Sequence, residues 1–324
     1  MLQKKYRILP IFLLVTTFHV IYGKTFITNG PCGRARFGHN LYLYLRAKLV
    51  SHATGVPYLY TPFIHSELLH LHHTEKRCPS EKYFAYVTRV KKINHVKSVA
   101  AKHRQQNALC VVKYKTDMDI FEAPEAFREK MRELLRPNFS VTKIAIPKDI
   151  TATVAIHIRR GDVVKMPDYK GKKFFENDHY ISALCKLLET LDDQQVYIHL
   201  YTDDPNPSAL AAHYEAVVAS RYRKNNASPG SGLRDQNDTL VGKKNLIFGW
   251  NNPEQTPKNI VSDMWNMAEF DYLIYPPASS FSRIASFIGR HKQVVILYDP
   301  NEKRQALPPL HNRPEVIPYW LPKT

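Results

Sequence analysis

The chain has 324 residues, of which 44% are hydrophobic and 23% are charged, and its formal net charge is +17 at pH 7. This composition is ordinary for a globular protein that buries a core, and it excludes a disordered chain or a coiled coil. The excess of Lys and Arg predicts attraction to anions, a class that includes nucleic acid, anionic lipid, sulfated glycans and nucleotide-activated substrates.

Residues 1–23 predict entry into the secretory pathway. Lys4, Lys5 and Arg7 precede an apolar stretch at 8–23, and this order matches the basic and hydrophobic regions of a secretory signal. The stretch is shorter than a typical membrane-spanning helix, so both a cleaved signal peptide and a retained signal anchor are compatible with it. We therefore expect the chain in the ER or Golgi lumen, or secreted if the signal is cleaved.

Sequons and cysteines agree with that compartment. Asn138, Asn226 and Asn237 each begin an Asn-X-Ser/Thr sequon. The cysteines are even in number, which suits an oxidising lumen, but their spacing fits no zinc template and leaves three disulfide pairings open. They are Cys32, Cys78, Cys110 and Cys185.

Residues 24–145 predict a first α/β domain. A strand at 24–28 leads through a Gly-rich turn at 29–40, where Arg34 and Arg36 would add positive charge to a cluster of backbone N–H groups. Prolines at 137 and 147 mark the end of this domain. The remaining predicted elements are a helix at 41–55, strands at 56–60 and 108–114, and a helix at 123–135.

Residues 146–324 alternate short β-branched or aromatic runs with helix-like segments. Such alternation is typical of βαβ units, in which helices cover both faces of a parallel sheet. A polar stretch at 221–243 predicts a surface loop. Strands are predicted at 152–158, 196–202, 245–249, 271–275 and 293–298, and helices at 179–191, 206–220, 257–270 and 281–289. The whole chain thus predicts two α/β domains that face a cleft.

The segment HIRRGD, residues 157–162, ends the first strand of the second domain. The strand period of two directs His157 and Arg159 to one face, at the carboxyl end where open α/β sheets bind ligands. Gly161 permits a turn that would bring Arg160 and Asp162 to the same crevice. Paired guanidinium groups suit a pyrophosphate, although a solvated face or a structural ion pair is an equally compatible interpretation of these residues alone.

HIRRGD resembles the first signature of the fucosyltransferase superfamily, which includes α1,2-, α1,6- and protein O-fucosyltransferases. Three further segments resemble that superfamily in the same order, and the resemblance spans residues 26 to about 298. They are GRARFGHNLYLYLRAKLVSHATGVPYLY (33–60), YTDDP (201–205) and SDMWNMAEFDYLIYPPASSFSRIASFIG (262–289).

The resemblance implies a GT-B-like α/β fold of two Rossmann-like domains, with residues 24–145 on the acceptor side and residues 146–324 binding a GDP-sugar. It implies inverting transfer of L-fucose from GDP-fucose to a glycan hydroxyl, with no metal or other cofactor. The linkage stays open between α1,6 and α1,2. A protein O-fucosyltransferase or a non-catalytic lumenal protein that binds glycan or nucleotide sugar are the alternatives, and a nucleic-acid partner is not expected because no nucleic-acid-binding module is present.

The resemblance also implies roles for particular residues. Arg159 is expected to stabilise the departing GDP, and either Asp168 or Asp162 to act as general base. Asp263 falls where the α1,6 enzymes place a guanine-reading aspartate, and a carboxylate can accept hydrogen bonds from both N–H groups of guanine's edge. The expected substrate-binding residues are His157, Arg160, Arg36, His39, Asn40, Asp203, Asp263, Ser279, Ser280 and Arg283.

Two features are less simply explained by the resemblance. The family's GNQ is GHN in this chain, which affects the contacts expected of His39 and Asn40. A histidine-rich segment at 65–73 is a possible metal site, but its histidines follow no one-face pattern, and no metal is expected.

Overall fold

The computed structural model describes residues 24–30, 36–103, 106–113, 117–161, 163–164, 174–191, 195–225, 245–251, 256–298 and 316–320. The chain divides into two compact units that interleave along the sequence. The first unit comprises Met1–Pro31, Leu43–Thr61 and Glu75–Met118, and the second comprises Cys32–Tyr42, Pro62–Thr74 and Asp119–Thr324. This division differs from a single boundary near residue 145, because residues 32–42, 62–74 and 119–145 group with the second unit.

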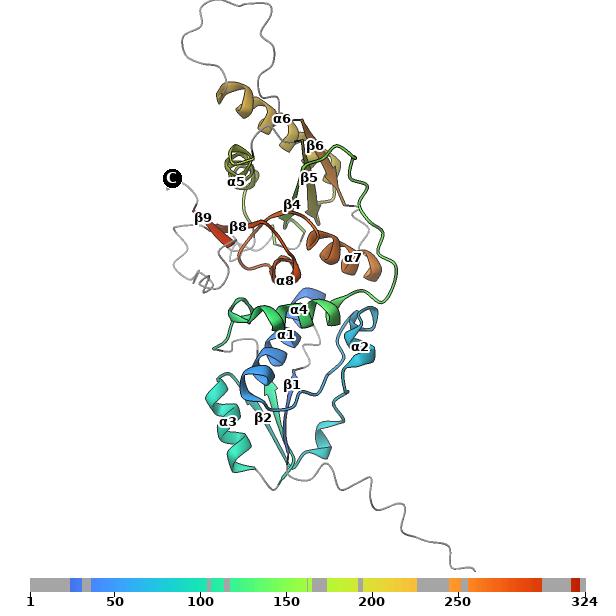
Figure 1. The fold of residues 1–324 in the computed structure, drawn as a ribbon, viewed down its shortest axis with the longest axis vertical. Coiled ribbons are helices and arrows are strands. Elements are labelled where there is room, and N and C mark those ends of the chain that lie inside the picture. The colour runs from blue at the N-terminus through green and yellow to red at the C-terminus, as the bar shows by residue number, and fades with distance from the viewer. Residues whose placement is uncertain are drawn as a thin grey trace, which may run out of the picture. The chain divides into compact units, whose positions relative to one another are not determined.

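The first unit contains a three-stranded parallel sheet in the order β1-β3-β2 (Figure 1). Its strands are β1 (Thr25–Asn29), β2 (Tyr86–Val90) and β3 (Ala108–Val112). The central strand β3 has the sequence ALCVV, and all five residues are buried, as expected for a parallel strand covered on both faces. The predicted strand at 56–60 forms only isolated bridges, from Tyr58 to Ile27 and from Tyr60 to Arg77.

Helices α1 and α3 accompany this sheet. Helix α3 (Ile93–Lys102) buries Val96 and Val99 and packs on β2 and β3. Helix α1 (Phe37–Thr54) starts in the second unit and continues into the first. The 3-10 helix η3 (Glu81–Tyr83) also belongs to the first unit. Four further elements belong to the second unit, namely η2 (Ser66–Leu68), α2 (Leu71–Thr74), η4 (Ile120–Glu122) and α4 (Glu125–Leu135).

The second unit contains a six-stranded parallel sheet in the order β6-β5-β4-β7-β8-β9. This is the strand order of the Rossmann fold, in which the chain starts at a central strand, winds to one edge, and then returns to wind towards the other. The strands are β4 (Ala152–Ile158), β5 (Val196–Thr202), β6 (Leu246–Trp250), β7 (Tyr272–Tyr275), β8 (Gln293–Tyr298) and β9 (Val316–Trp320).

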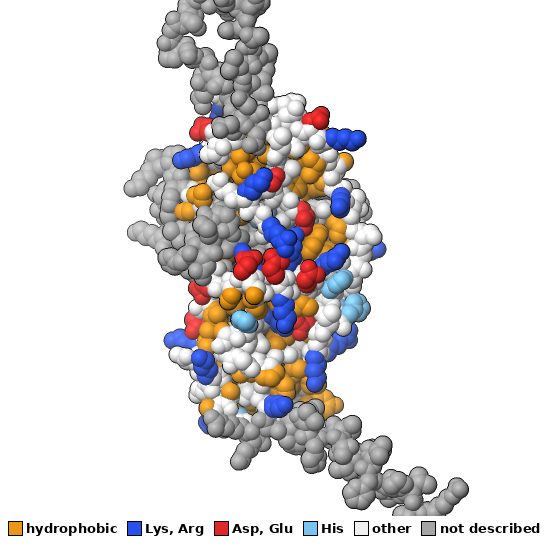
Figure 2. All heavy atoms as spheres, viewed as in Figure 1, with side chains coloured by type: hydrophobic (Ala, Val, Ile, Leu, Met, Phe, Trp, Pro, Cys, Tyr) orange, Lys and Arg blue, Asp and Glu red, His pale blue; other side chains and the backbone are white. Residues whose placement is uncertain are grey.

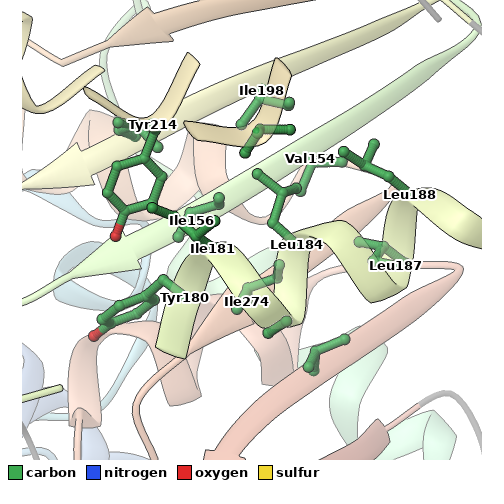
Figure 3. Packing of buried hydrophobic residues seen from close by; sticks show 14 of the residues in the cluster. Val154, Ile156, Tyr180, Ile181, Leu184, Leu187, Leu188, Ile198, Tyr214 and Ile274 are labelled. Carbon is green, nitrogen blue, oxygen red and sulfur yellow. The ribbon is translucent and has the colours of Figure 1, made fainter. Parts of the chain in front are cut away.

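Helices connect the strands of this sheet, and α5 provides much of its core. Figure 3 shows Ile181, Leu184 and Leu188 of α5 pointing towards Val154 and Ile156 of β4, and all five are completely buried. Burial of each such side chain stabilises the fold by about 1.5–3 kcal/mol. The helices are α5 (Asn177–Glu189), α6 (Pro207–Asn225), α7 (Pro257–Met267) and α8 (Ser280–Ile288).

Several elements differ from those expected. Strands β2 and β9 and helix α3 were not predicted, and α6 extends to Asn225, beyond the predicted start of a loop at 221. The rest of that predicted loop and the signal segment 1–23 lie outside the described residues. Within the described residues, no helix combines the length and the hydrophobicity that a membrane span requires.

The structure describes one of the three sequons and three of the four cysteines. Asn138 is exposed, and its Nδ2 donates a hydrogen bond to the carbonyl of Glu67 at 2.7 Å. Cys78, Cys110 and Cys185 are free thiols. The sequons at 226 and 237 and Cys32 lie outside the described residues.

Candidate functional site

A pocket of about 810 Å³ opens at the carboxyl ends of β4, β5, β6 and β7, and every residue that lines it belongs to the second unit. Strands β4 and β7 are neighbours, and the chain changes its winding direction between them. Open α/β sheets bind ligands at this switch point, because the loops that follow the two strands separate there. The lining residues are Arg36, Phe37, Gly38, His39, Ile64, His65, His157, Arg159, Gly161, Tyr201, Thr202, Asp203, Asn251, Ile260, Asp263, Ala278, Ser279, Ser280 and Phe281.

Arg159 supplies positive charge to the pocket. It follows β4, its side chain is 19% exposed, and its Nε lies 3.4 Å from Oδ2 of Asp203. A guanidinium group keeps its charge at any physiological pH and donates hydrogen bonds in a planar fork. The alternation along β4 places it as the sequence predicts, because Val154, Ile156 and Ile158 of the other face lie in the core.

His157 is a buried neutral imidazole beside Arg159. Its Nδ1 lies 2.9 Å from Ser282 Oγ and 3.3 Å from Ser279 Oγ. Burial, together with the positive charge of Arg159, lowers the pKa of His157 to about 3. This side chain therefore adds no charge at neutral pH, and it connects the end of β4 to the start of α8.

Arg160 points away from the pocket. It is only 9% exposed, and its Nη1 donates hydrogen bonds to the carbonyls of Phe175 at 2.9 Å and Arg159 at 3.0 Å. Its Nη2 donates to Asn177 Oδ1, and its guanidinium lies 5.9 Å from the ring centre of Tyr180. The expected pair of pocket arginines is thus a single pocket arginine, Arg159, and a buried structural one, because adjacent residues leave the strand in opposite directions.

Asp203 shapes the turn after β4. Its Oδ1 accepts hydrogen bonds from the backbone N–H groups of Arg160 at 2.6 Å and Gly161 at 3.1 Å. A Cβ atom on Gly161 would lie 2.7 Å from Asp203 Oδ2, so a larger residue at this position would displace the Asp203 carboxylate. Asp203 lines the pocket, as predicted, but its carboxylate is already engaged by the turn and by Arg159.

The start of α8 forms another wall. Ser279 is the N-cap, and its side chain accepts a hydrogen bond from the N–H of Ser282. The first N–H groups of a helix lack intrahelical partners and carry partial positive charge, so they favour an anion. Ser279, Ser280 and Phe281 all line the pocket at this end of the helix.

Asp263 lies on α7 and is the other carboxylate among the described residues that line the pocket. Its Oδ2 accepts a hydrogen bond from Asn251 Nδ2 at 3.2 Å, and Asn251 Oδ1 in turn accepts from the N–H of Thr202. Burial raises the pKa of Asp263 to about 7, although the hydrogen bond from Asn251 opposes that shift. Asp263 therefore changes charge near neutral pH.

The start of α1 completes the pocket. Arg36 and His39 line it, whereas Asn40 is buried and donates from Nδ2 to the carbonyl of Arg36 at 3.3 Å. A Cβ atom on Gly38 would lie 3.0 Å from the backbone N and Cα of Phe281, so α1 and α8 approach each other here through a glycine.

Arg283 does not line the pocket. It forms an ion pair with Asp119 at 2.7 Å, and its guanidinium lies over the rings of Tyr42 and Phe121. These contacts give Arg283 a structural role, in contrast to the substrate contact expected from the sequence. The two predicted general bases, Asp162 and Asp168, lie outside the described residues.

The histidine-rich segment does not assemble into a metal site. Among the described residues, no group of three or more His, Cys, Asp or Glu side chains could hold a metal ion. His65 instead lines the pocket, and it adopts a left-handed backbone conformation with φ of 62°. His73 lies beside Asn138 at 3.3 Å.

Tyr201, Asn251 and His65 are among the pocket residues that were not predicted as ligand contacts. Tyr201 opens the YTDDP segment, but only the aspartates of that segment suggested binding chemistry. Asn251 directly follows β6, and its position at a strand end is the one signal that could have identified it.

The fold and the pocket define an α/β protein with a Rossmann-type ligand site. Comparison of the sequence with models of known families and with curated proteins gives no match. Among solved structures, a point mutant of Arabidopsis thaliana FUT1 in complex with GDP is similar, with a TM-score of 0.51 and 12% identity over 88% of this chain and 73% of that chain. POFUT1 in complex with GDP-fucose gives a TM-score of 0.43 and 9% identity over 85% and 98%.

At such low identity, the likeness to FUT1 shows a shared fold. The predicted α/β, GT-B-like class is therefore confirmed, with parallel sheets of the kind found in GT-B fucosyltransferase structures.

Proposed function

We propose that this protein is a glycosyltransferase that transfers L-fucose from GDP-fucose to a hydroxyl group of a glycan. The observation that carries the proposal is the content of the pocket at the Rossmann switch point, where Arg159 and the start of α8 form a cationic end and Asp263 is a buried carboxylate. A volume of about 810 Å³ is in the range that suits such a ligand.

The cationic groups match a diphosphate. Arg159 donates to phosphate oxygens, and the N–H groups at the start of α8 add neutral donors that need no counterion. The Nδ1 atom of His157 lies within hydrogen-bond distance of Ser279 and Ser282 and so orients the start of α8. Because the imidazole is neutral, it adds no positive charge of its own to the anion site. The likeness to the fold of FUT1, whose solved structure contains GDP, supports the same assignment.

The proposed reaction is a single in-line displacement. The acceptor oxygen forms a bond to the anomeric carbon of fucose while the bond from that carbon to the β-phosphate oxygen breaks, and GDP departs with the electron pair. The acceptor attacks from the face opposite the leaving GDP, so the configuration at the anomeric carbon inverts. Arg159 and the α8 N-terminus stabilise the charge that develops on the leaving oxygen, and the proposed reaction uses no metal ion. The acceptor proton passes to a general base, for which Asp162 and Asp168 remain the candidates, and the reaction takes place in the secretory lumen.

Calorimetric titration with GDP-fucose, GDP-mannose and GDP tests donor binding, and incubation with labelled GDP-fucose and a glycan array tests transfer. We expect binding of GDP-fucose and labelled product in the presence of EDTA, followed by linkage analysis to separate α1,6 from α1,2 products. Absence of any GDP-nucleotide binding would contradict the proposal. Binding without transfer to glycans or to folded protein acceptors would instead identify a non-catalytic nucleotide-sugar-binding protein.

A further inference from the structure

Tyr201 carries a buried hydroxyl group that has no protein partner within the described part of the chain. The residue lies near the carboxyl end of β5, lines the pocket and is 2% exposed. Its hydroxyl makes no hydrogen bond to any residue that the structure describes. A buried polar group without a partner destabilises a protein by about 1–3 kcal/mol, and native proteins leave few such groups unless a ligand or water satisfies them.

The ring of Tyr201 is held in place by other aromatic side chains. Its centre lies 4.6 Å from the ring of His199 and 6.0 Å from the ring of Phe270. His199 is two residues back on the same face of β5, and its Nδ1 lies 2.9 Å from the hydroxyl of Tyr197. The hydroxyl of Tyr201 therefore has a defined position, and a ligand would meet it without an entropic penalty for ordering the side chain.

Asp263 lines the same pocket, and its negative charge acts on this hydroxyl. Burial and the negative charge of Asp263 both raise the pKa of Tyr201, so the phenol keeps its proton and remains a donor. Asn251 occupies one oxygen of Asp263. The pocket thus offers both a carboxylate acceptor and an O–H donor.

That arrangement is complementary to one nucleobase edge. Guanine presents two adjacent donors, N1–H and the 2-amino group, next to the acceptor O6. Adenine presents an acceptor at N1 and a donor at position 6, so it would set an acceptor against the carboxylate and a donor against the phenol.

We propose that the Tyr201 hydroxyl donates a hydrogen bond to O6 of guanine while Asp263 accepts from N1–H and the 2-amino group, which makes Tyr201 a second determinant of guanine specificity. This inference rests on the proposed function, because it takes the pocket's ligand to be a GDP-sugar. It adds a contact at O6 to the contacts with N1–H and the 2-amino group that are expected of Asp263.

A double-mutant cycle, in which the ligand and Tyr201 are each changed separately and then together, tests the contact. Calorimetry would measure the Kd of GDP, of 6-thio-GDP, whose sulfur is a weak acceptor, and of IDP, which lacks the 2-amino group. For the unaltered protein we expect both analogues to bind about 5- to 100-fold more weakly than GDP, because each leaves one buried polar group unpaired. Tyr201→Phe should weaken GDP binding by a similar factor and should abolish the preference for GDP over 6-thio-GDP, while the preference for GDP over IDP remains.

Tyr214→Phe is the matched control. Tyr214 is fully buried in the core of the second unit and its hydroxyl also lacks a hydrogen-bond partner among the described residues, but it does not line the pocket. We expect Tyr214→Phe to bind GDP and 6-thio-GDP as the unaltered protein does. The inference is overturned if Tyr201→Phe binds GDP with unchanged affinity, or if it weakens GDP and 6-thio-GDP equally. A complete lack of GDP binding by the unaltered protein would overturn the proposed function as well.

Discussion

At the scale of single residues, the adjacent arginines Arg159 and Arg160 have different tasks. Arg159 lines the pocket beside Asp203, whereas Arg160 donates to the carbonyls of Arg159 and Phe175 and to the side chain of Asn177. The strand end separates them, because one side chain follows the pocket face and the next follows the opposite face.

Alanine substitutions should separate these tasks. Arg159→Ala is expected to reduce kcat/KM for fucose transfer by about 10²–10³-fold with little change in the free energy of unfolding, since it removes charge stabilisation of the leaving group. Arg160→Ala is expected to lower the free energy of unfolding by about 2–4 kcal/mol, since it leaves buried acceptors unpaired. Transfer kinetics and urea denaturation measure the two effects. Arg290→Ala, at an exposed ion pair with Glu129, serves as control, and equal destabilisation by both substitutions would contradict this assignment.

Asp263 should make donor binding depend on pH. Its pKa is raised to about 7, and only the carboxylate form accepts both N–H groups of guanine. We expect the affinity for GDP-fucose to fall about tenfold for each pH unit below 7, because protonation must be reversed before the base binds. Titrations between pH 5.5 and 8 measure this effect, and GDP-fucose is used because its diphosphate does not titrate in that range. Asp263→Asn should remove the dependence, and a flat profile for the unaltered protein would contradict it.

The same shift has a consequence for stability. A carboxyl group whose pKa is higher in the folded than in the unfolded protein opposes folding. This cost grows as the pH rises from the unfolded pKa of about 4 to the folded pKa of about 7, and it is constant above that. Asp263→Asn should therefore raise Tm at pH 8, by about 2–4 °C for each kcal/mol gained, while it weakens GDP-fucose binding. Thermal unfolding at pH 8 and pH 4 checks the sign of this change.

At the scale of elements, the contact between the start of α1 and the start of α8 holds two walls of the pocket together. Gly38 meets the backbone of Phe281, and the N–H groups that would bind phosphate belong to the same turn of α8. The geometry of the anion site therefore depends on a glycine at position 38, far from position 281 in the sequence.

Gly38→Ala should weaken GDP binding and also destabilise the fold by about 1–3 kcal/mol, because backbone atoms must shift to admit the methyl group. Gly55→Ala is a matched control: Gly55 has φ of +71° at the end of α1, and a methyl group added there would have no atom within 4 Å. The control should destabilise through its backbone conformation alone and leave GDP affinity unchanged. Calorimetry and thermal unfolding compare the two, and unchanged GDP affinity in Gly38→Ala would contradict the role of this contact.

The elements of the second half were predictable, and those missed have identifiable reasons. Continuous apolar runs predicted β4, β5, β7 and β8, because strands buried on both faces have few polar residues. Strand β9 contains Pro318, which is unusual within a sheet and is tolerated at an edge, where β9 lies. Strand β2 is also an edge strand, and its alternating exposure gives it a weaker apolar signal.

At the scale of the whole molecule, the positive charge is concentrated in the first unit. Among its described residues, Glu75, Glu81 and Asp117 are the acidic side chains, against twelve Lys or Arg. In Figure 2, the region that holds the three-stranded sheet shows blue Lys and Arg side chains and hardly any red acidic ones. Lys91 and Lys113 follow neighbouring strands, and the N–H of Lys113 donates to the carbonyl of Val90.

This charge should produce salt-dependent binding to polyanions. We expect retention on a sulfated-polysaccharide column, with elution at lower salt after Lys91, Lys92 and Lys113 are changed to Glu, because fewer counterions are then exchanged. The same change should leave GDP affinity unaltered, since none of these residues lines the pocket. Replacing the exposed Lys186 and Lys258 of the second unit provides the control, and an unchanged elution position for the triple variant would contradict the expectation.

The sequence by itself determined the α/β class, the alternation of the second half and the placement of His157 and Arg159 on the pocket face of β4. These properties depend on the periodicity of neighbouring residues, which can be read locally. The resemblance through HIRRGD and the segment 262–289 suggested a nucleotide-sugar site, and that assignment is part of the proposed function.

Only the tertiary structure decided which of the suggested residues meet. It brought Tyr201 and Asn251 to Asp263, turned Arg160 into the fold and paired Arg283 with Asp119. Each of these outcomes depends on packing and hydrogen bonding between segments far apart in the sequence. The preferences of neighbouring residues along the chain do not contain that information, because a polar side chain's role is set by the partners that the fold brings within reach.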